Sequence, residues 1–285
     1  MGICMRDGII LRIRTGYEKF SKNQKILANY ILQNPSEVAF ISINEFAGKV
    51  QISPATITRF VRKAGYESYA EFQKALYEES SGPPFAKFKT MLKSRMDEND
   101  PEDALRWSIS NGGELLNKLY TPKLQQAFFR STQLLLKSDK IYIAGQRSSY
   151  TAAYYLAFMF QQMRENVHLV SLVSTAFPTE FIDITPKDCL VLVSYSRYTA
   201  ASFKIASCFN KIGCEIIAIT DSTTSPIALK ATEVLVVPNG ENFSPLNAIA
   251  VCDGFIRNFA QHNTEKVLKR MEQQDLLAAE QDVYI

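Results

Sequence analysis

Residues 42–65 read S-I-N-E-F-A-G-K-V-Q-I-S-P-A-T-I-T-R-F-V-R-K-A-G, and this pattern predicts two short helices joined by a tight turn. In the first helix the apolar residues recur at i, i+3, i+4 and i+7, the spacing of one helical face. After a break at Gln51 and Ile52, Ser53 is the expected N-cap of the second helix and Pro54 its first residue. The final glycine of the stretch is expected to end that helix.

The second of these helices combines small hydroxyls near its start with cations later on. Its outward residues suit base edges and phosphates, although an ordinary solvated helix could carry the same side chains. A helix-turn-helix that places this helix in the major groove predicts that the residues nearest the bases are Ser53, Pro54, Thr56 and Arg59. Those nearer the phosphates are then Thr58, Arg62 and Lys63.

The charge distribution favours the nucleic-acid interpretation. Residues 1–80 hold 11 Lys and Arg against 8 Asp and Glu, whereas residues 81–285 hold 21 of each. The net charge of +3 therefore belongs to the segment with the helical pair. With 285 residues, 46% of them hydrophobic, the chain is long enough for two domains with cores of their own.

Several classes of protein are disfavoured by the composition. No apolar run approaches the roughly 20 residues that cross a bilayer, and charges interrupt the N-terminus, so we expect a cytoplasmic protein without a membrane partner. The five cysteines form no C-x-x-C pair, which indicates neither a disulfide framework nor a zinc site. One of the two histidines, His168, lies within an apolar run and is expected to be buried. Neither a metal nor a cofactor is predicted.

Breaks in the pattern divide the chain into four segments. A helix from Ser21 to Leu32 and the helical pair belong to a first domain, which ends near S-S-G-P-P at 80–84. A linker with connecting helices follows, with expected interruptions at Asp100-Pro101, Gly112-Gly113 and Thr121-Pro122. The expected segments are a helical domain at 1–79, the linker at 80–123, an α/β domain at 124–263 and a C-terminal helix at 264–285.

Short apolar runs alternate with amphipathic segments after residue 140. Five runs predict buried strands, at 141–144, 167–173, 189–193, 216–219 and 234–237. The segments between most of them are long enough for crossover helices, so the fold class expected here is a doubly wound, mostly parallel five-stranded α/β domain. Its ligand site should lie at the carboxyl ends of the strands, where the strand order reverses.

Three of the loops that follow these strands are rich in hydroxyls. They read G-Q-R-S-S at 145–149, S-Y-S-R-Y-T at 194–199 and T-D-S-T-T-S-P at 220–226, and each is expected to lead to a helix start. Hydroxyls beside a helix N-terminus form a cradle for an anion, although Ser149, Thr199 and Ser225 could equally be ordinary N-caps. Two such loops on one sheet favour an anion site, whose predicted residues are Arg147, Ser148, Ser149, Ser194, Ser196, Arg197 and Thr199.

The sequence also resembles a known family. The segments S-K-N-Q-K-I-L-A-N-Y-I-L-Q-N-P, S-I-N-E-F-A, I-S-P-A-T-I-T-R-F-V-R-K-A-G-Y and Y-A-E-F-Q-K-A-L are similar to the N-terminal domain of the RpiR family of bacterial transcription regulators. In that family a helix-turn-helix domain precedes an SIS (sugar isomerase) domain. The G-Q-R-S-S and S-Y-S-R-Y-T loops lie where the family has G-x-G-x-S and S-x-S-G-x-T phosphosugar loops.

The resemblance implies roles for individual residues. By this likeness the phosphate of a sugar phosphate would be held by Ser148, Ser194, Ser196 and Thr199. Two positions depart from the pattern: Arg147 takes the place of the second glycine or its neighbour, and Arg197 replaces the glycine of the second loop. Arg197 could grip a more anionic ligand or narrow the pocket.

The resulting hypothesis is a transcription regulator without catalytic residues. It would bind an operator in double-stranded DNA as a homodimer or higher homo-oligomer and sense a phosphorylated sugar or sugar acid. The alternative is a sugar-phosphate isomerase with an accessory helical domain, for which Glu180 is the one candidate base. The absence of histidine from the hydroxyl loops favours the regulator.

Overall fold

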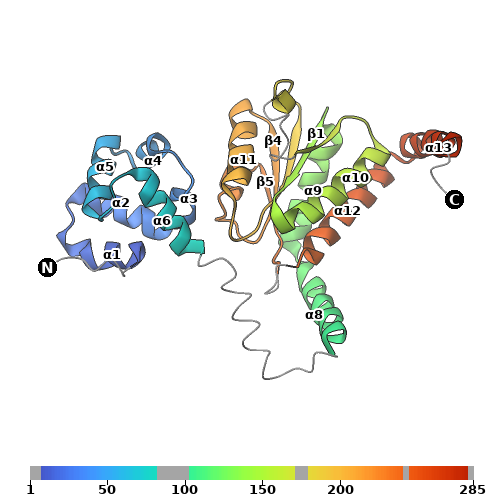
Figure 1. The fold of residues 1–285 in the computed structure, drawn as a ribbon. Helices are drawn as coiled ribbons and strands as arrows, with labels where there is room; N and C mark the ends of the chain where they lie inside the picture. The colour runs from blue at the N-terminus through green and yellow to red at the C-terminus, as the bar shows by residue number, and fades with distance from the viewer. Residues whose placement is uncertain (1–7, 82–102, 171–178, 240–243, 282–285) are drawn as a thin grey trace. The chain divides into compact units, whose positions relative to one another are not determined.

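The computed structural model describes residues 8–81, 103–170, 179–239 and 244–281 of the chain (Figure 1). These residues divide into two compact units, an N-terminal helical unit and a C-terminal α/β unit. In the described parts, no helix combines the length and the apolar character needed to cross a bilayer.

The N-terminal unit is all-helical, and local sequence signals set its helix starts. Ser21 and Ser42 each begin a helix with a capping box, in which the serine side chain accepts from the third backbone N–H and the side chain of Gln24 or Glu45 accepts in return. The elements are α1 (Ile9–Gly16), η1 (Tyr17–Lys19), α2 (Lys22–Gln33), α3 (Pro35–Val38), α4 (Ile43–Val50), α5 (Pro54–Lys63) and α6 (Tyr69–Ser81).

The predicted helical pair is α4 and α5, joined by a tight turn at Gln51. Gln51 ends α4 in the left-handed region, with φ 57°. Phe46 of α4 and Phe60 of α5 are fully buried, as is Phe72 of α6. The periodicity of the sequence thus identified both the helices and their apolar stripes.

The C-terminal unit alternates strands and helices. Its elements are α8 (Ala104–Leu119), α9 (Pro122–Lys137), β1 (Ile141–Gly145), η3 (Arg147–Ser149), α10 (Tyr150–Met163), β2 (Val167–Val170), η4 (Thr179–Phe181), β3 (Cys189–Val193), α11 (Ala200–Ile212), β4 (Glu215–Thr220), η5 (Ala228–Lys230), β5 (Glu233–Val236), α12 (Leu246–His262) and α13 (Thr264–Glu280).

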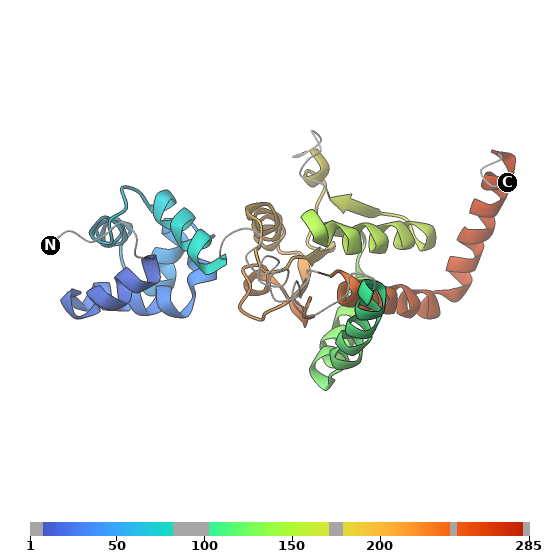
Figure 2. The same cartoon turned by 60° about the horizontal axis from the view of Figure 1, so that its bottom comes forward.

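The five strands form one parallel sheet in the order β2-β1-β3-β4-β5. Alternate side chains of each strand point to opposite faces and enter separate cores. On one face Ile143 and Val191 pack with α9, α10 and α12, and on the other Tyr142 and Leu190 pack with α11 (Figure 1). The predicted doubly wound fold class is confirmed. Figure 2 shows α13 continuing from α12 after a bend.

The structure corrects three details of the sequence prediction. His168 is exposed rather than buried, because β2 is the edge strand, and its ring stacks on Tyr142 at 4.9 Å. Gly112 and Gly113 do not interrupt the chain but lie inside α8, where Gly112 packs closely against Leu246 of α12. The loop at 220–226 leads only to the short turn η5. Of the predicted strand 167–173, positions 171–173 lie outside the described residues.

Candidate functional site

Strand order places two of the predicted loops side by side. The chain enters β1 before β2 but continues through β3 on the other side of β1, so the order reverses between β1 and β3. Gly145 at the end of β1 pairs with Val193 at the end of β3. The loops 145–149 and 194–199 therefore leave the same edge of the sheet from neighbouring strands, at the point where ligands bind in such folds.

The loop after β1 is held by backbone packing. A Cβ on Gly145 would lie 2.5 Å from the carbonyl oxygen of Ser149, so only glycine lets the start of α10 approach the strand this closely. Arg147 is exposed and has φ 57°. Ser148 is exposed and Ser149 is buried, and within the described residues neither hydroxyl makes a hydrogen bond. Although Ser149 precedes α10, its side chain does not cap that helix.

The loop after β3 is held by side chains instead. The Thr199 hydroxyl caps α11 by accepting from the backbone N–H of Ser202 at 3.1 Å. Ser194 is only 4% exposed. Arg197, which takes the place of the family glycine, is half-buried and has φ 28°. As with Arg147, the backbone keeps the positive φ that glycine accommodates most easily.

Asp221, at the end of β4, was not assigned a role by the sequence analysis. Its carboxylate accepts the backbone N–H of Ser196 at 3.0 Å and the hydroxyl of Tyr198 at 2.7 Å. One side chain thus fixes the middle of the β3 loop to the neighbouring strand. In the sequence, Asp221 is visible only as an acidic residue directly after a buried strand. Its role becomes clear once β4 is known to lie beside β3.

Two tyrosines of the β3 loop are kept neutral. Burial, and then the nearby carboxylate of Asp221, raise the pKa of Tyr198 well above its ordinary value, so its hydroxyl remains a donor. Burial raises the pKa of Tyr195 in the same direction. In the described part of the chain the Tyr195 hydroxyl has no hydrogen-bond partner. Both tyrosines of this loop therefore present neutral hydroxyl groups rather than phenolates.

The predicted DNA-contacting residues form the exposed face of α5. Ser53 precedes the helix but does not cap its backbone, because its hydroxyl pairs with that of Thr56 at 3.0 Å. Arg59 donates to the same Thr56 hydroxyl at 3.2 Å. Pro54 and Arg62 are exposed, and Pro54 supplies the first residue of the helix. The three side chains at 53, 56 and 59 therefore lie in a row along one exposed stripe.

Two of the predicted DNA-contacting residues form hydrogen bonds within the N-terminal unit. The Thr58 hydroxyl donates to the carbonyl of Pro54 at 3.0 Å. The ammonium of Lys63 donates to the carbonyl of Lys19 and to the side chain of Gln24, both at 3.1 Å, and lies 5.4 Å from the ring centroid of Phe20. Lys63 thus has structural partners in the N-terminal unit, whereas the exposed Arg62 is the cation with fewer contacts.

Two other kinds of group would indicate a different chemistry at the site: a catalytic base and a metal-binding cluster. Glu180 lies in η4, but its side chain is outside the described residues. Among the residues with described positions, no three His, Cys, Asp or Glu side chains cluster so as to hold a metal ion.

In comparisons with known proteins, one family model matches each of the two units. The model of the helix-turn-helix domain of the rpiR family matches residues 7–83, and the SIS domain model matches residues 134–256. An uncharacterised HTH-type transcriptional regulator of Haemophilus influenzae is 24% identical over 81% of this chain and 80% of its own. The HTH-type transcriptional regulator HexR of Pseudomonas aeruginosa is 23% identical over 82% of this chain and 80% of its own.

A solved structure has the same overall fold. The NanR protein of Vibrio vulnificus, determined in complex with ManNAc-6P, matches with a TM-score of 0.60 and 21% identity, covering 95% of this chain and 98% of NanR. The chain thus contains an rpiR-family helix-turn-helix domain followed by an SIS domain, and it aligns with named HTH-type transcriptional regulators over about four fifths of its length. The chain belongs to the RpiR family of transcription regulators.

Proposed function

We propose that the protein binds operator DNA through α5 and that a phosphorylated sugar or sugar acid at the loops after β1 and β3 alters this binding. The observation that carries the effector site is a set of uncommitted hydroxyls. In the described residues four serine hydroxyls of the two loops make no intramolecular hydrogen bond, those of Ser148, Ser149, Ser194 and Ser196. Ser149 and Ser194 are buried residues, but their hydroxyl oxygens are not among the buried polar atoms without a partner, so an anion in the site can accept hydrogen bonds from the four hydroxyls.

The electrostatics of these loops favour an anion. The backbone N–H groups at the starts of α10 and α11 point to the carboxyl edge of the sheet and carry a partial positive charge there. Arg147 is exposed beside them, and in the described structure it makes no ion pair. Asp221 opposes an anion by its charge, but two donors of the β3 loop already occupy its oxygens.

A relative supports the choice of a phosphorylated sugar. NanR, whose fold this chain shares, is described in complex with ManNAc-6P. At 21% identity this likeness does not identify the ligand of the present chain. It indicates that a fold of this kind accommodates a sugar phosphate, which agrees with the hydroxyl-rich loops.

The effector site is tested by thermal unfolding of the full chain with a panel of phosphorylated sugars and sugar acids. A ligand at 100 times its dissociation constant should add about 2.7 kcal/mol to the free energy of unfolding. Ser196→Ala should reduce this gain, whereas Ser110→Ala, on the exposed surface of α8, should leave it unchanged. A gain that survives Ser196→Ala in full would place the ligand elsewhere.

The DNA-binding face is tested by a matched pair of arginines on α5. Arg59 lies in the row with Ser53 and Thr56, so Arg59→Ala should cost about 1 to 3 kcal/mol and relax preference at one base position. Arg62→Ala should weaken binding to all sequences alike and lower the salt dependence. Equal loss of affinity and of sequence preference in both variants would contradict the assignment of Arg59 to base contacts.

We infer that the SIS domain acts by binding rather than by catalysis. The relatives with which the chain aligns over most of its length are named transcriptional regulators. Incubation of the protein with the same panel should therefore give no ketose–aldose interconversion. Because one helical domain with a small net charge binds DNA weakly, we also propose a homodimer on a palindromic operator, and sedimentation as a monomer at working concentration would contradict this.

A further inference from the structure

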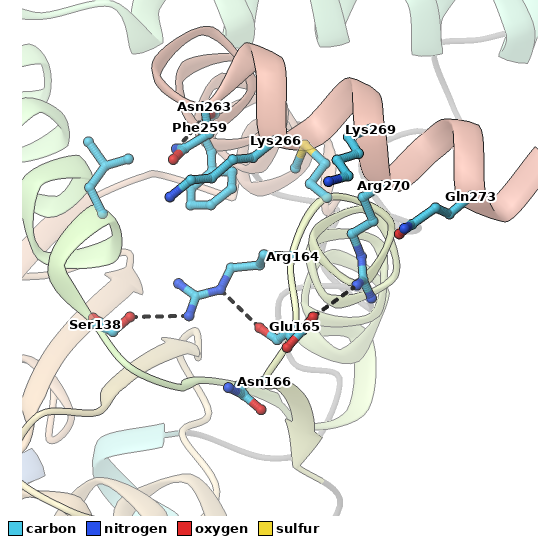
Figure 3. Close-up of a pocket in the computed structure, with 12 residues that line it drawn as sticks. Ser138, Arg164, Glu165, Asn166, Phe259, Asn263, Lys266, Lys269, Arg270 and Gln273 are labelled. Atoms are coloured by element: carbon cyan, nitrogen blue, oxygen red, sulfur yellow. Dashed lines mark hydrogen bonds and ion pairs between the residues drawn. The ribbon is translucent and has the colours of Figure 1, made fainter.

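A cavity of about 420 Å³ lies at the opposite edge of the sheet from the loops 145–149 and 194–199, which we call the serine loops. It opens where α9, α10 and α12 end and where α13 begins (Figure 3). Its wall combines four cations with one acid, Glu165, and includes an apolar patch. The lining residues that matter here are Arg164, Lys266, Lys269 and Arg270 on the charged side and Leu136, Met163 and Phe259 on the apolar side.

Two of these cations, both arginines, bond backbone carbonyls at the ends of helices. Helices leave unpaired carbonyls at their C-terminal ends, and cations often satisfy them. Arg270 of α13 donates to the carbonyl of Gln161 in the last turn of α10, and its guanidinium lies 3.9 Å from Glu165. Arg164 donates to the carbonyls of Ser138 at 3.1 Å and Asp139 at 2.6 Å, just beyond the end of α9.

Arg164 still has hydrogen-bonding capacity directed at the cavity. Its Nε donates to the carbonyl of Glu165 and its Nη2 to the two carbonyls beyond α9, which leaves the two N–H groups of Nη1 without a partner among the described residues. The side chain is half-buried, and burial lowers the pKa of Arg164. An anion that accepts hydrogen bonds from the unused donors of a partly buried guanidinium is held more strongly than one beside a fully solvated guanidinium.

The two lysines have no such structural role. Lys266 and Lys269 are exposed, and within the described residues neither ammonium makes an ion pair or a hydrogen bond. Figure 3 shows both side chains reaching from α13 over the hollow that Arg164 faces from the other wall. The one acid of the lining, Glu165, is 82% exposed and already lies beside Arg270. The cavity is therefore lined by more positive charges than are needed to bond the carbonyls at the ends of the helices.

We propose that this cavity binds a small organic phosphate, held by Lys266, Lys269 and the free edge of Arg164. Lysine ammonium groups bind phosphate as point charges, and a guanidinium edge adds directed donors. The volume lies in the range of pockets for small molecules. The apolar wall of Leu136, Met163 and Phe259 would contact the organic part. This site is separate from the serine loops and does not depend on the function proposed for them.

Titration calorimetry of the full chain with inorganic phosphate and with phenyl phosphate tests the proposal. The measurements use a Ser196→Ala background, so that binding at the serine loops contributes little. Phenyl phosphate should bind more tightly than inorganic phosphate because of the apolar wall. Replacing both lysines, Lys266→Gln with Lys269→Gln, should weaken binding of both probes by roughly tenfold or more.

Lys204→Gln, an exposed lysine on α11, is the matched control and should leave both affinities unchanged. Both lysines are exposed and make no ion pair or hydrogen bond with the described residues, so the double variant should unfold at the temperature of the parent. Unchanged affinity in the double variant, or an equal loss in Lys204→Gln, would overturn the site. Equal affinity for the two probes would overturn the assignment to an organic phosphate.

Discussion

The loops after β1 and β3 face the same edge of the sheet but are stabilised by different means. The first, at 145–149, depends on the close approach of α10 to Gly145, and its hydroxyls remain uncommitted in the described structure. The second, at 194–199, is fixed by side chains, with Thr199 capping α11 and Asp221 accepting from two of its groups. Each contains an arginine with positive φ.

The two loops are therefore expected to contribute differently to ligand binding. The β3 loop uses part of its polar groups to hold its own shape, so it can present Ser194 and Ser196 in a fixed position. The β1 loop leaves Ser148 and Arg147 at the surface, where they can adapt to a ligand. Preorganised donors lose less entropy on binding than adaptable ones do. The β3 loop is therefore expected to set affinity, and the β1 loop to tune which ligand is accepted.

The largest effect is expected from Gly145→Ala. The new Cβ would lie 2.5 Å from the Ser149 carbonyl oxygen, so backbone must move, and we expect a loss of about 1 to 3 kcal/mol in the free energy of unfolding. Gly113→Ala in α8 is the control, since a Cβ there meets nothing within 4 Å and should stabilise the helix slightly. Denaturant unfolding measures both. Equal stability of the two variants would contradict the packing account of the β1 loop.

Asp221→Ala should have the next largest effect. It removes the acceptor of the Ser196 N–H and the Tyr198 hydroxyl, which should cost about 1 to 3 kcal/mol of stability and weaken effector binding. Asp221→Asn keeps one acceptor oxygen and should retain more of both. If Asp221→Ala bound the effector as well as the wild type, the carboxylate would have no role in positioning the loop.

The capping role of Thr199 gives a smaller effect. Thr199→Ala removes the acceptor for the Ser202 N–H and should lower the free energy of unfolding by about 1 kcal/mol. Ser148→Ala is the counterpart in the β1 loop and should change stability by less than about 0.5 kcal/mol, because its hydroxyl is exposed and uncommitted. Thermal unfolding without ligand measures both. A larger loss for Ser148→Ala would reverse the comparison between the loops.

The two arginines with positive φ are expected to change stability in the opposite direction. Glycine relieves strain at such positions but increases the freedom of the unfolded chain, so Arg147→Gly should be neutral or stabilising by up to about 1 kcal/mol. Arg197→Gly should gain less, because this half-buried side chain also loses its packing. Effector titration of Arg197→Gly then decides its role: weaker binding indicates that Arg197 grips the ligand, and tighter binding that it narrows the pocket.

Local sequence signals predicted much of this architecture. The helix expected from Ser21 to Leu32, the apolar stripes of the helical pair and the five apolar runs each correspond to an element of the structure. These features depend on neighbours within a turn or on burial of a whole strand, so the sequence contains them directly. The position of the serine loops followed from the rule that parallel strands end at the same edge.

The features that escaped prediction depend on the order of the strands and on contacts between distant segments. His168 looked buried because its neighbours are apolar, but only the strand order shows that β2 is an edge. Asp221 acquires its role because β4 lies beside β3. The cationic cavity brings Arg164 together with Lys266 and Lys269, about a hundred residues later, and no local pattern connects them.

The central claim is that occupancy of the serine loops changes DNA binding by α5. The most direct measurement is the affinity of the full chain for a duplex selected by the protein itself from random sequence, with and without each phosphorylated sugar. At least one ligand should shift this affinity by about fivefold or more in the wild type, and Ser196→Ala should abolish the shift. Constant affinity across the panel, or a shift that Ser196→Ala leaves intact, would contradict the claim.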